Sequence, residues 1–124
     1  MKGLKTLAAI SGVAALLLCA VPASAKSAAF THYVACGLSQ NAKPSHFCQK
    51  SRKKGAFFRS NKADVFYTVC VQFPTKKRLC APRQEAVKGT LYVNKVTSNI
   101  PGGHKVTWFV EGKRVGTFLF RVPE

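Results

Sequence analysis

The stretch GHKVTWFVEGKRVGTFLFRV, residues 103–122, decides the fold of this chain. On both sides of the central segment Glu111–Arg114, apolar and polar side chains alternate with a period of two. This period is typical of β-strands that bury one face. The stretch therefore predicts a β-hairpin with strands over 105–110 and 115–122, whose apolar face is formed by Val106, Trp108, Phe118, Phe120 and Val122.

The register of this hairpin follows from keeping the apolar residues on one face. A two-residue loop at 112–113 pairs Trp108 with Thr117, whereas a shift of one residue pairs Trp108 with Phe118. We favour the shifted register, because a slip of one residue moves side chains to the opposite face of a sheet.

Other segments of the chain are also typical of strands. The octet VFYTVCVQ, residues 65–72, is dense in β-branched and aromatic residues, and 78–82 and 90–97 are further expected strands. Turn-forming residues follow at 73–77 and 99–103. No helical period of useful length appears, so the expected fold is an all-β antiparallel sandwich.

The chain after the first 25 residues is expected to form one domain. Residues 26–62 are predicted to be an irregular, disulfide-containing segment, in which only 30–35 and 55–59 look extended. Residues 63–124 are predicted to form the β-rich sandwich core. A length of this order suits a single domain with a modest core.

The hairpin at 103–122 resembles the closing hairpin of small immunoglobulin-like domains in bacterial exported proteins, and the hairpin at 65–80 extends the likeness. The resemblance implies a small immunoglobulin-like β-sandwich and carries over no functional residue. Antibody-type domains place a disulfide between the two sheets beside a tryptophan. The cysteines of this chain are too clustered to repeat that arrangement.

Residues 1–25 have the pattern of a secretory signal peptide. Lys2 and Lys5 give a positive start, the stretch 7–21 carries no charge, and 23–25 has the small-x-small form of a cleavage site. We predict cleavage between Ala25 and Lys26, which makes the mature protein secreted or associated with the cell envelope.

The leader has two alternative interpretations, a membrane anchor and a lipoprotein signal. The apolar stretch is short for a membrane-spanning helix and has the wrong flanks, and no later segment is apolar enough to span a membrane. Cys19 invites comparison with a lipoprotein signal, but the residue before it is the large Leu18. We therefore expect neither an anchor nor lipidation.

Four cysteines remain after the leader, and they predict two disulfides. An even cysteine count in an exported chain is typical of a disulfide framework. Cys70 and Cys80 lie symmetrically about Thr75, so a hairpin centred there brings them within disulfide reach. Cys36 is then left to pair with Cys48. A four-cysteine zinc site is the alternative, but the close pairs of such sites are missing.

Catalysis and metal binding are not expected. Ser45, His46 and Asp64 could be written as a catalytic triad, but no G-x-S-x-G motif supports it. His32, His46 and His104 are expected to be exposed, and the spacing of His32 and His46 does not favour copper or zinc binding. We predict no cofactor and no enzymatic activity.

The charge is the strongest functional signal in the sequence. After residue 25 the chain has 18 Lys and Arg but only four acids, a net charge of +14 with neutral histidines. Most of these cations fall in two runs, and the first has Phe47, Phe57 and Phe58 as neighbours. Basic residues beside aromatic rings can hold polyanions by charge and stacking. The predicted polyanion-binding residues are Lys50, Arg52, Lys53, Lys54, Arg59, Lys62, Lys76, Lys77, Arg78 and Arg83.

These observations predict an exported, non-enzymatic binding module for an anionic partner: a wall polymer, an anionic membrane surface or an acidic protein. A generally basic surface and buried phenylalanines are the alternative interpretation. No motif for sequence-specific nucleic-acid reading is present. A cationic antimicrobial role rests on the same physics, although the amphipathic helix that usually inserts is missing. The disulfide-clamped basic loop 73–78 permits a different hypothesis, inhibition of a trypsin-like protease.

Overall fold

The computed structural model describes residues 28–124, so the predicted leader and its cleavage site lie outside the described residues. One antiparallel sheet has the strand order β2-β3-β7, and the other has the order β5-β4-β8-β9, with β6 pairing to β4. The strands are β2 (Phe30–Ala35), β3 (Lys54–Ser60), β4 (Val65–Gln72), β5 (Arg78–Cys80), β6 (Gln84–Ala86), β7 (Leu91–Val96), β8 (Gly102–Val110) and β9 (Lys113–Val122).

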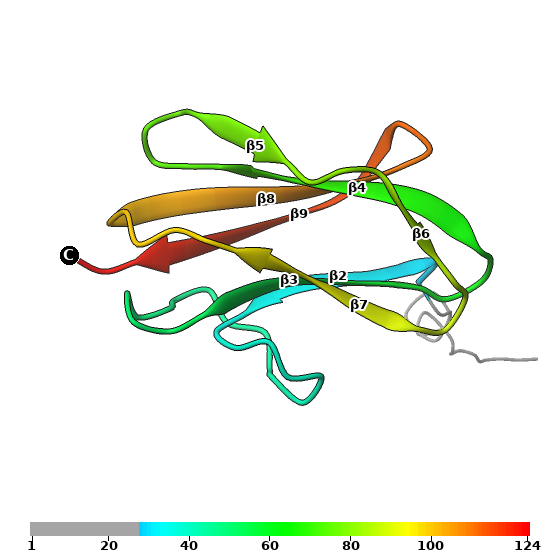
Figure 1. The fold of residues 1–124 in the computed structure, drawn as a ribbon, viewed down its shortest axis with the longest axis horizontal. Helices are drawn as coiled ribbons and strands as arrows, with labels where there is room; N and C mark the ends of the chain where they lie inside the picture. Colours follow the sequence, from blue (N-terminus) through cyan, green and yellow to red (C-terminus); the bar gives the residue numbers. More distant parts are fainter. Residues whose placement is uncertain (1–27) are drawn as a thin grey trace, which may run out of the picture.

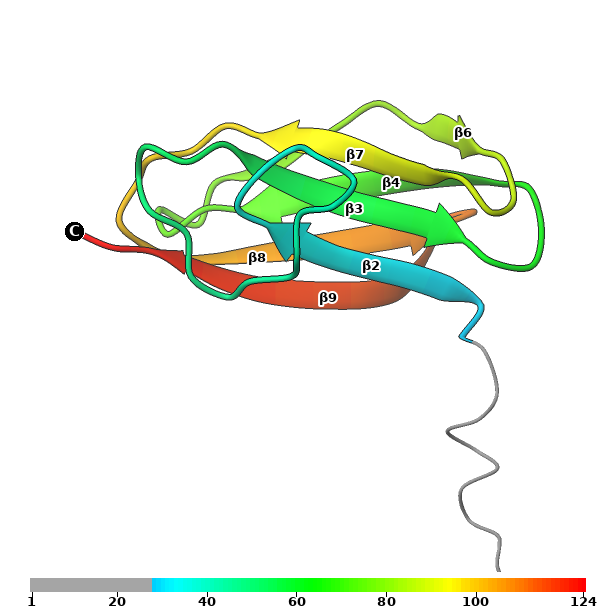
Figure 2. The same cartoon turned by 90° about the horizontal axis from the view of Figure 1, so that it is seen from below.

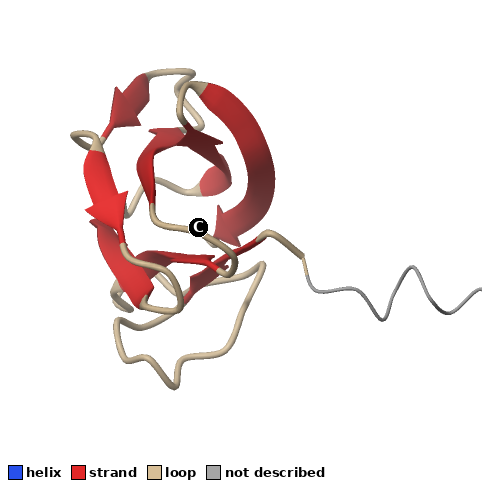
Figure 3. Ribbon diagram, turned by 90° about the vertical axis from the view of Figure 1, so that its right-hand side faces the viewer, coloured by secondary structure: helices blue, strands red, loops and turns tan. Residues whose placement is uncertain are grey.

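The two sheets pack face to face around one apolar core, as Figures 1 and 3 show. Trp108 on β8 is fully buried, and Tyr67 on β4 stacks on Phe58 of β3 with ring centroids 4.2 Å apart. The Tyr67 hydroxyl donates to the side chain of Asn94 at 2.8 Å. The core is thus built by the inward positions of both sheets, which confirms the predicted all-β sandwich.

The strand order is that of an immunoglobulin-like fold. Lettered in chain order, β2, β3 and β7 are the A, B and E strands and form one sheet. The other sheet contains β5, β4, β8 and β9, which are the C′, C, F and G strands. This partition is the immunoglobulin-like one, although β6 pairs with β4 and not with β7. The buried tryptophan lies on β8 rather than on the C strand, and no disulfide joins β3 to β8 within the described residues.

The β8–β9 hairpin confirms the predicted apolar face and corrects its register. Trp108 pairs with Gly116, so the favoured pairing with Phe118 was wrong, as was the alternative with Thr117. The observed pairing differs from the favoured one by two residues. An even shift leaves the same side chains on the same face, so Phe118 packs against the core and the other four predicted residues are buried.

A β-bulge reconciles the turn of this hairpin with its apolar face. Val110 pairs with Lys113 around the loop Glu111–Gly112, whose φ angles of 50° and 83° define a type I′ turn. If the pairing continued from this turn without interruption, Trp108 would pair with Val115, and the apolar residues of β8 and β9 would lie on opposite faces of the hairpin. Val115 is one extra residue on β9, and it shifts the pairing next to Trp108 back to the face-preserving register.

The segment 26–62 supplies two strands of the three-stranded sheet. β2 and β3 pair over their whole length, from Phe30 with Ser60 to Ala35 with Gly55. Residues 36–53 between them form only isolated bridges. Figure 2 shows this long connection crossing the outside of the sheet, with β2 lying beside β9. β6 was not predicted, because its three residues carry no apolar run.

The two predicted disulfides are confirmed. Cys70 and Cys80 are directly opposite residues of β4 and β5, and Cys36 pairs with Cys48 across the connection between β2 and β3. The four-cysteine zinc site is therefore excluded. Disulfides of this kind indicate an extracellular or envelope location. Among residues 28–124, no helix is long and apolar enough to cross a membrane.

Candidate anion-binding face

The first predicted basic run does not converge on one surface. Lys50, Arg52 and Lys53 are exposed in the turn before β3, and the Arg52 guanidinium donates to the Cys36 carbonyl at 2.9 Å. Arg59 and Lys62 lie at the other end of β3. The strand separates the two groups by about 20 Å, at about 3.3 Å per residue.

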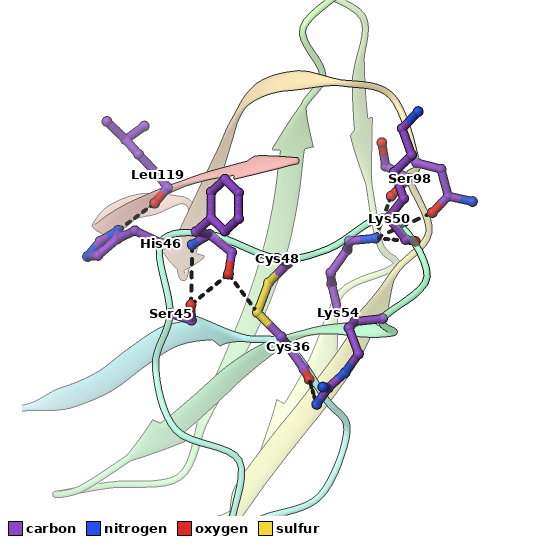
Figure 4. Close-up of a disulfide and its surroundings, with 11 residues drawn as sticks. Cys36, Ser45, His46, Cys48, Lys50, Lys54, Ser98 and Leu119 are labelled. Carbon is purple, nitrogen blue, oxygen red and sulfur yellow. Dashed lines mark hydrogen bonds between the residues drawn. A yellow bond between two sulfur atoms is a disulfide. The ribbon is translucent and has the colours of Figure 1, made fainter. Parts of the chain in front are cut away.

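Lys54 is buried and has a structural role, so the prediction that it binds polyanions is wrong. Its side chain is 1% exposed, and Nζ donates to the carbonyl oxygens of Lys50 at 3.2 Å and Ser98 at 2.9 Å (Figure 4). Desolvation lowers the pKa of this ammonium. Lys54 thereby ties the start of β3 to the loop between β7 and β8.

His104 is also buried, contrary to the expectation that it is exposed. Its Nδ1 lies 3.1 Å from the Gly102 carbonyl and its Nε2 lies 2.7 Å from the Ser98 hydroxyl. The neutral tautomer with the proton on Nδ1 satisfies both contacts. Desolvation lowers the pKa of His104, and the nearby Lys54 acts in the same direction against a raising contribution from the Gly102 hydrogen bond. The imidazole ring stacks on Phe120.

The other two histidines pack on aromatic rings. His32 is partly buried and stacks on Trp108, so its predicted exposure is wrong in part. His46 is exposed as predicted, stacks on Phe118 with centroids 4.2 Å apart, and places Nδ1 2.6 Å from the Leu119 carbonyl (Figure 4). No group of three metal-ligating side chains occurs within the described part of the chain.

The second predicted basic run divides between the two ends of one sheet. Lys76 and Lys77 are exposed in the turn between β4 and β5, and Arg78 begins β5. Arg83 lies elsewhere, with its guanidinium 4.0 Å from the ring centroid of Phe66 and 3.6 Å from a carboxylate oxygen of Glu111. Arg83 is therefore engaged with an acid, whereas the other three cations have no ion pair among the described residues.

Strand pairing places Arg78 beside cations that no sequence run contains. Gln72 on β4 pairs with Arg78 on one side and with Lys105 of β8 on the other, so the three side chains share the outer face of the sheet. Arg114 of β9 lies opposite Phe109, and the Arg78 guanidinium is 5.5 Å from the ring centroid of Phe109. We call Arg78, Lys105, Arg114 and Phe109 the basic face; they line a shallow hollow of about 480 Å³.

A second hollow adjoins the basic face where β8 begins. Lys105 lines both hollows, and the second also contains Lys76, Arg121 and His46 in its walls. Its volume is about 570 Å³. We call this hollow the end groove. The two hollows together form a continuous basic surface across the outer side of the five-stranded sheet.

The internal acids line neither hollow. Asp64 directly precedes β4, Glu85 pairs with Phe66 near the start of β4, and a Glu111 carboxylate oxygen accepts from the Phe66 amide at 3.1 Å. Lys105 is six residues from Glu111 along β8, a distance of about 20 Å in a strand. Glu124 follows β9 and lines neither hollow.

Sequence reasoning missed Lys105, Arg114 and Arg121 because none of them lies in either of the two basic runs: Lys105 and Arg121 stand alone in the apolar hairpin, and Arg114 has only Lys113 beside it. In a strand, outward side chains are two residues apart, so a basic sheet face never appears as a run of cations. The available signal was the hairpin itself: Lys105 and Arg121 occupy positions that alternate with its apolar face.

The loop 73–78 is a compact turn. The Lys76 amide donates to the Phe73 carbonyl and the Phe73 amide donates to the Lys77 carbonyl, both at 2.8 Å, and Lys76 has a φ of 75°. Phe73 itself is buried. Peptides that add to a strand edge do so in an extended form. The turn offers no extended segment, so its geometry gives no support to the protease-inhibitor hypothesis.

The described residues thus define an immunoglobulin-like β-sandwich with two disulfides and a basic sheet face. No protein-family model and no curated protein matches the sequence. Among solved structures, the chain is similar to the crystal structure of an immunoglobulin-like protein (PA1606) from Pseudomonas aeruginosa, with 15% identity and a TM-score of 0.47 over 77% of this chain and 93% of that chain. This is a likeness of fold alone; the fold class rests on the strand pairing of this chain.

Proposed function

We propose that this protein is an exported, non-enzymatic binding module that holds an anionic polymer of the cell envelope or the extracellular space on its basic face. The proposal includes removal of residues 1–25 by cleavage between Ala25 and Lys26. The two disulfides support an oxidising compartment. The immunoglobulin-like sandwich supports a binding role, since it presents a rigid sheet on which side chains hold fixed positions.

The basic face is the observation that carries the proposal. Arg78, Lys105 and Arg114 come from three strands and line one hollow together with Phe109, and no carboxylate lines that hollow. Guanidinium groups bind phosphate and carboxylate oxygens in a two-pronged manner. Because the strands already hold these cations in place, little conformational entropy is lost when an anion binds.

A polymer fits this surface better than a single ion because the cations follow the strand direction. Arg114 lies level with Phe109, Lys105 lies four residues further along β8, and Arg121 pairs with Gly103 at the end of the strand. At about 3.3 Å per residue, the cations extend over about 20 Å. A chain of regularly spaced anionic groups could contact all of them at once.

Binding of polyphosphate by the oxidised protein tests the proposal. The variant Arg78→Gln/Lys105→Gln/Arg114→Gln removes the basic face, and Lys43→Gln/Lys62→Gln/Lys88→Gln removes the same charge from exposed residues away from both hollows. We expect the first variant to bind at least tenfold more weakly. The slope of log K against log salt should fall by about 2 to 3, since about one counterion is released for each phosphate contact.

The charge-matched control separates a defined site from general attraction. We expect the control to keep more than half of the salt slope of the unmodified protein. Equal losses in the two variants would contradict the proposal, because the charge would then act without regard to position. Vesicles of phosphatidylglycerol are the second probe; tighter binding to vesicles than to polyphosphate would identify an anionic membrane as the partner instead.

A further inference from the structure

We propose that the end groove, which shares Lys105 with the basic face, is also a binding site for a small amphiphilic anion, a molecule with one phosphate or carboxylate group on an apolar body. The inference goes beyond the proposed function, because it assigns a different ligand class to a different hollow. The end groove has a volume of about 570 Å³, within the range of about 300 to 1,000 Å³ in which small-molecule sites fall.

Three cations from different elements surround the groove. Lys76 comes from the β4–β5 turn, Lys105 from the start of β8 and Arg121 from the end of β9. No carboxylate of the described residues lines the hollow. The uncompensated positive charge selects an anionic group, and a guanidinium beside two ammonium groups suits a phosphate or a carboxylate.

The backbone holds the wall of the groove in place. The Arg121 amide donates to the His46 carbonyl at 2.8 Å, and the Cys48 amide donates to the Arg121 carbonyl at 2.9 Å. The disulfide between Cys36 and Cys48 fixes the same loop from its other side (Figure 4). Because His46 Nδ1 lies against the Leu119 carbonyl, the imidazole is also oriented by the protein. The site is therefore preorganised, which favours binding of a small ligand.

Apolar groups line the same hollow. Leu119 pairs directly with Lys105 on the outer face of β9 and is 58% exposed. Pro74 and Phe73 line the groove near Lys76. A ligand that carried charge alone would leave these surfaces in water, whereas an apolar body would cover them at a gain of about 25 cal/mol for each Å² buried.

Gly103 allows the groove to be filled without disturbing the fold. It lines the hollow, and a Cβ built on it meets only the Arg121 guanidinium, at 3.9 Å. Its φ lies outside the left-handed region, unlike that of neighbouring Gly102, whose φ is 123°. A larger side chain at residue 103 is therefore expected to occupy the groove while the strand keeps its conformation.

Calorimetric titration with hexyl phosphate, inorganic phosphate and 1-hexanol tests whether charge and apolar body are both recognised. We expect hexyl phosphate to bind at least tenfold more tightly than either of the other two probes. Hexanoate forms a further arm and shows whether the site takes carboxylate as well as phosphate. Hexyl phosphate binding no more tightly than inorganic phosphate would overturn the proposal, since the groove would then be a simple anion site.

Variants locate the binding within the molecule. Gly103→Leu should weaken hexyl phosphate binding at least tenfold with an unchanged melting temperature. Leu119→Ser should weaken the same binding several-fold, and it serves as the test should Gly103→Leu lower the stability of the fold. Arg114→Gln, which lies outside the groove, should leave it unchanged. Hexyl phosphate binding that survives both groove variants would contradict the proposal.

The two proposals can fail independently. The basic-face variant, with which polyphosphate binding is tested, keeps two of the three cations of the end groove, Lys76 and Arg121. Conversely, Gly103→Leu keeps Arg78 and Arg114. If polyphosphate does not bind the protein but hexyl phosphate does, the proposed polymer function is wrong and the end groove stands as the binding site.

Discussion

At the scale of single residues, the most informative feature is a buried polar cluster that contains no carboxylate. Lys54 and His104 both contact Ser98: the Lys54 ammonium donates to the Ser98 carbonyl oxygen, and the His104 ring lies against the Ser98 hydroxyl. A buried ammonium is usually held by an acid, since desolvation of the charge is costly. Here the backbone carbonyls of Lys50 and Ser98 fill that role.

The buried imidazole predicts a specific pH dependence of stability. Because the folded state lowers the pKa of His104, the unfolded chain binds more protons at pH values between the lowered value and the usual 6.5. Stability should therefore be fully present above pH 6.5 and fall as the pH decreases through this window. Lys54, the cation that faces His104 across Ser98, acts in the same direction.

Urea unfolding of the wild type and His104→Gln measures this effect. We expect the variant to be less stable at neutral pH, and the difference in unfolding free energy to narrow towards acid pH. The narrowing can reach about 1.4 kcal/mol for each pH unit within the window. A difference that stays constant between about pH 5 and pH 7.5 would show that His104 does not titrate with unfolding.

Single-residue charge in the sequence did not reveal which cations are exposed. Lys53 and Lys54 are neighbours in one basic run, yet the first is exposed and the second is buried. The difference arises because β3 begins at Lys54 and its side chain is directed to the β7–β8 loop. Such a contact joins residues 44 positions apart, and the local pattern holds no information on it.

At the scale of elements, one glycine allows β2 to close the side of the sandwich against β9. A Cβ at Gly116 would overlap the imidazole ring of His32 on β2, which stacks on Trp108. Gly116 is also the residue that pairs with Trp108. The absence of a side chain there therefore makes room for the His32 ring over the buried tryptophan.

Substitution of this glycine should be destabilising for steric reasons alone. We expect Gly116→Ala to lower the free energy of unfolding by about 1 to 3 kcal/mol, the usual cost of overpacking. Gly103→Ala is the matched control in the preceding strand, with open space at its Cβ and an expected effect within about 0.5 kcal/mol. Chemical denaturation measures both variants.

A second substitution identifies the cause. His32→Ala combined with Gly116→Ala should recover part of the loss relative to the sum of the two single changes, because the overlapping ring is then absent. Strict additivity of the two changes would mean that the Gly116 backbone, and not the His32 ring, accounts for the destabilisation.

The elements themselves could largely be predicted from the sequence, whereas their exact pairing could not. Alternation of apolar residues predicted which face of the β8–β9 hairpin is buried, because burial acts on every second residue. The register was wrong because the turn lies at Glu111–Gly112, one residue earlier than the loop considered, and because Val115 adds a bulge to β9. A non-glycine residue with positive φ in that turn gives no clear signal in the sequence.

At the scale of the whole molecule, charge is unevenly distributed over one sheet. The three internal acids lie at the end of the five-stranded sheet where β4 begins, and the end groove lies at its other end. The basic face extends between them, from Lys105 to Arg114, which is three residues after Glu111. Counting charges predicted a basic protein and an anionic partner. The position of the site depended on strand order, which brings Arg78, Lys105 and Arg114 together from residues up to 36 positions apart.

The central claim is that this uneven charge creates a binding face on the five-stranded sheet. The most direct test is a titration of the ¹⁵N-labelled, oxidised protein with polyphosphate, followed by ¹H–¹⁵N correlation spectra. We predict that amide signals shift along β4, β5, β8 and β9 around Arg78, Lys105 and Arg114, while those of β2, β3 and β7 stay in place. Shifts spread evenly over both sheets, or confined to β2, β3 and β7, would contradict the account.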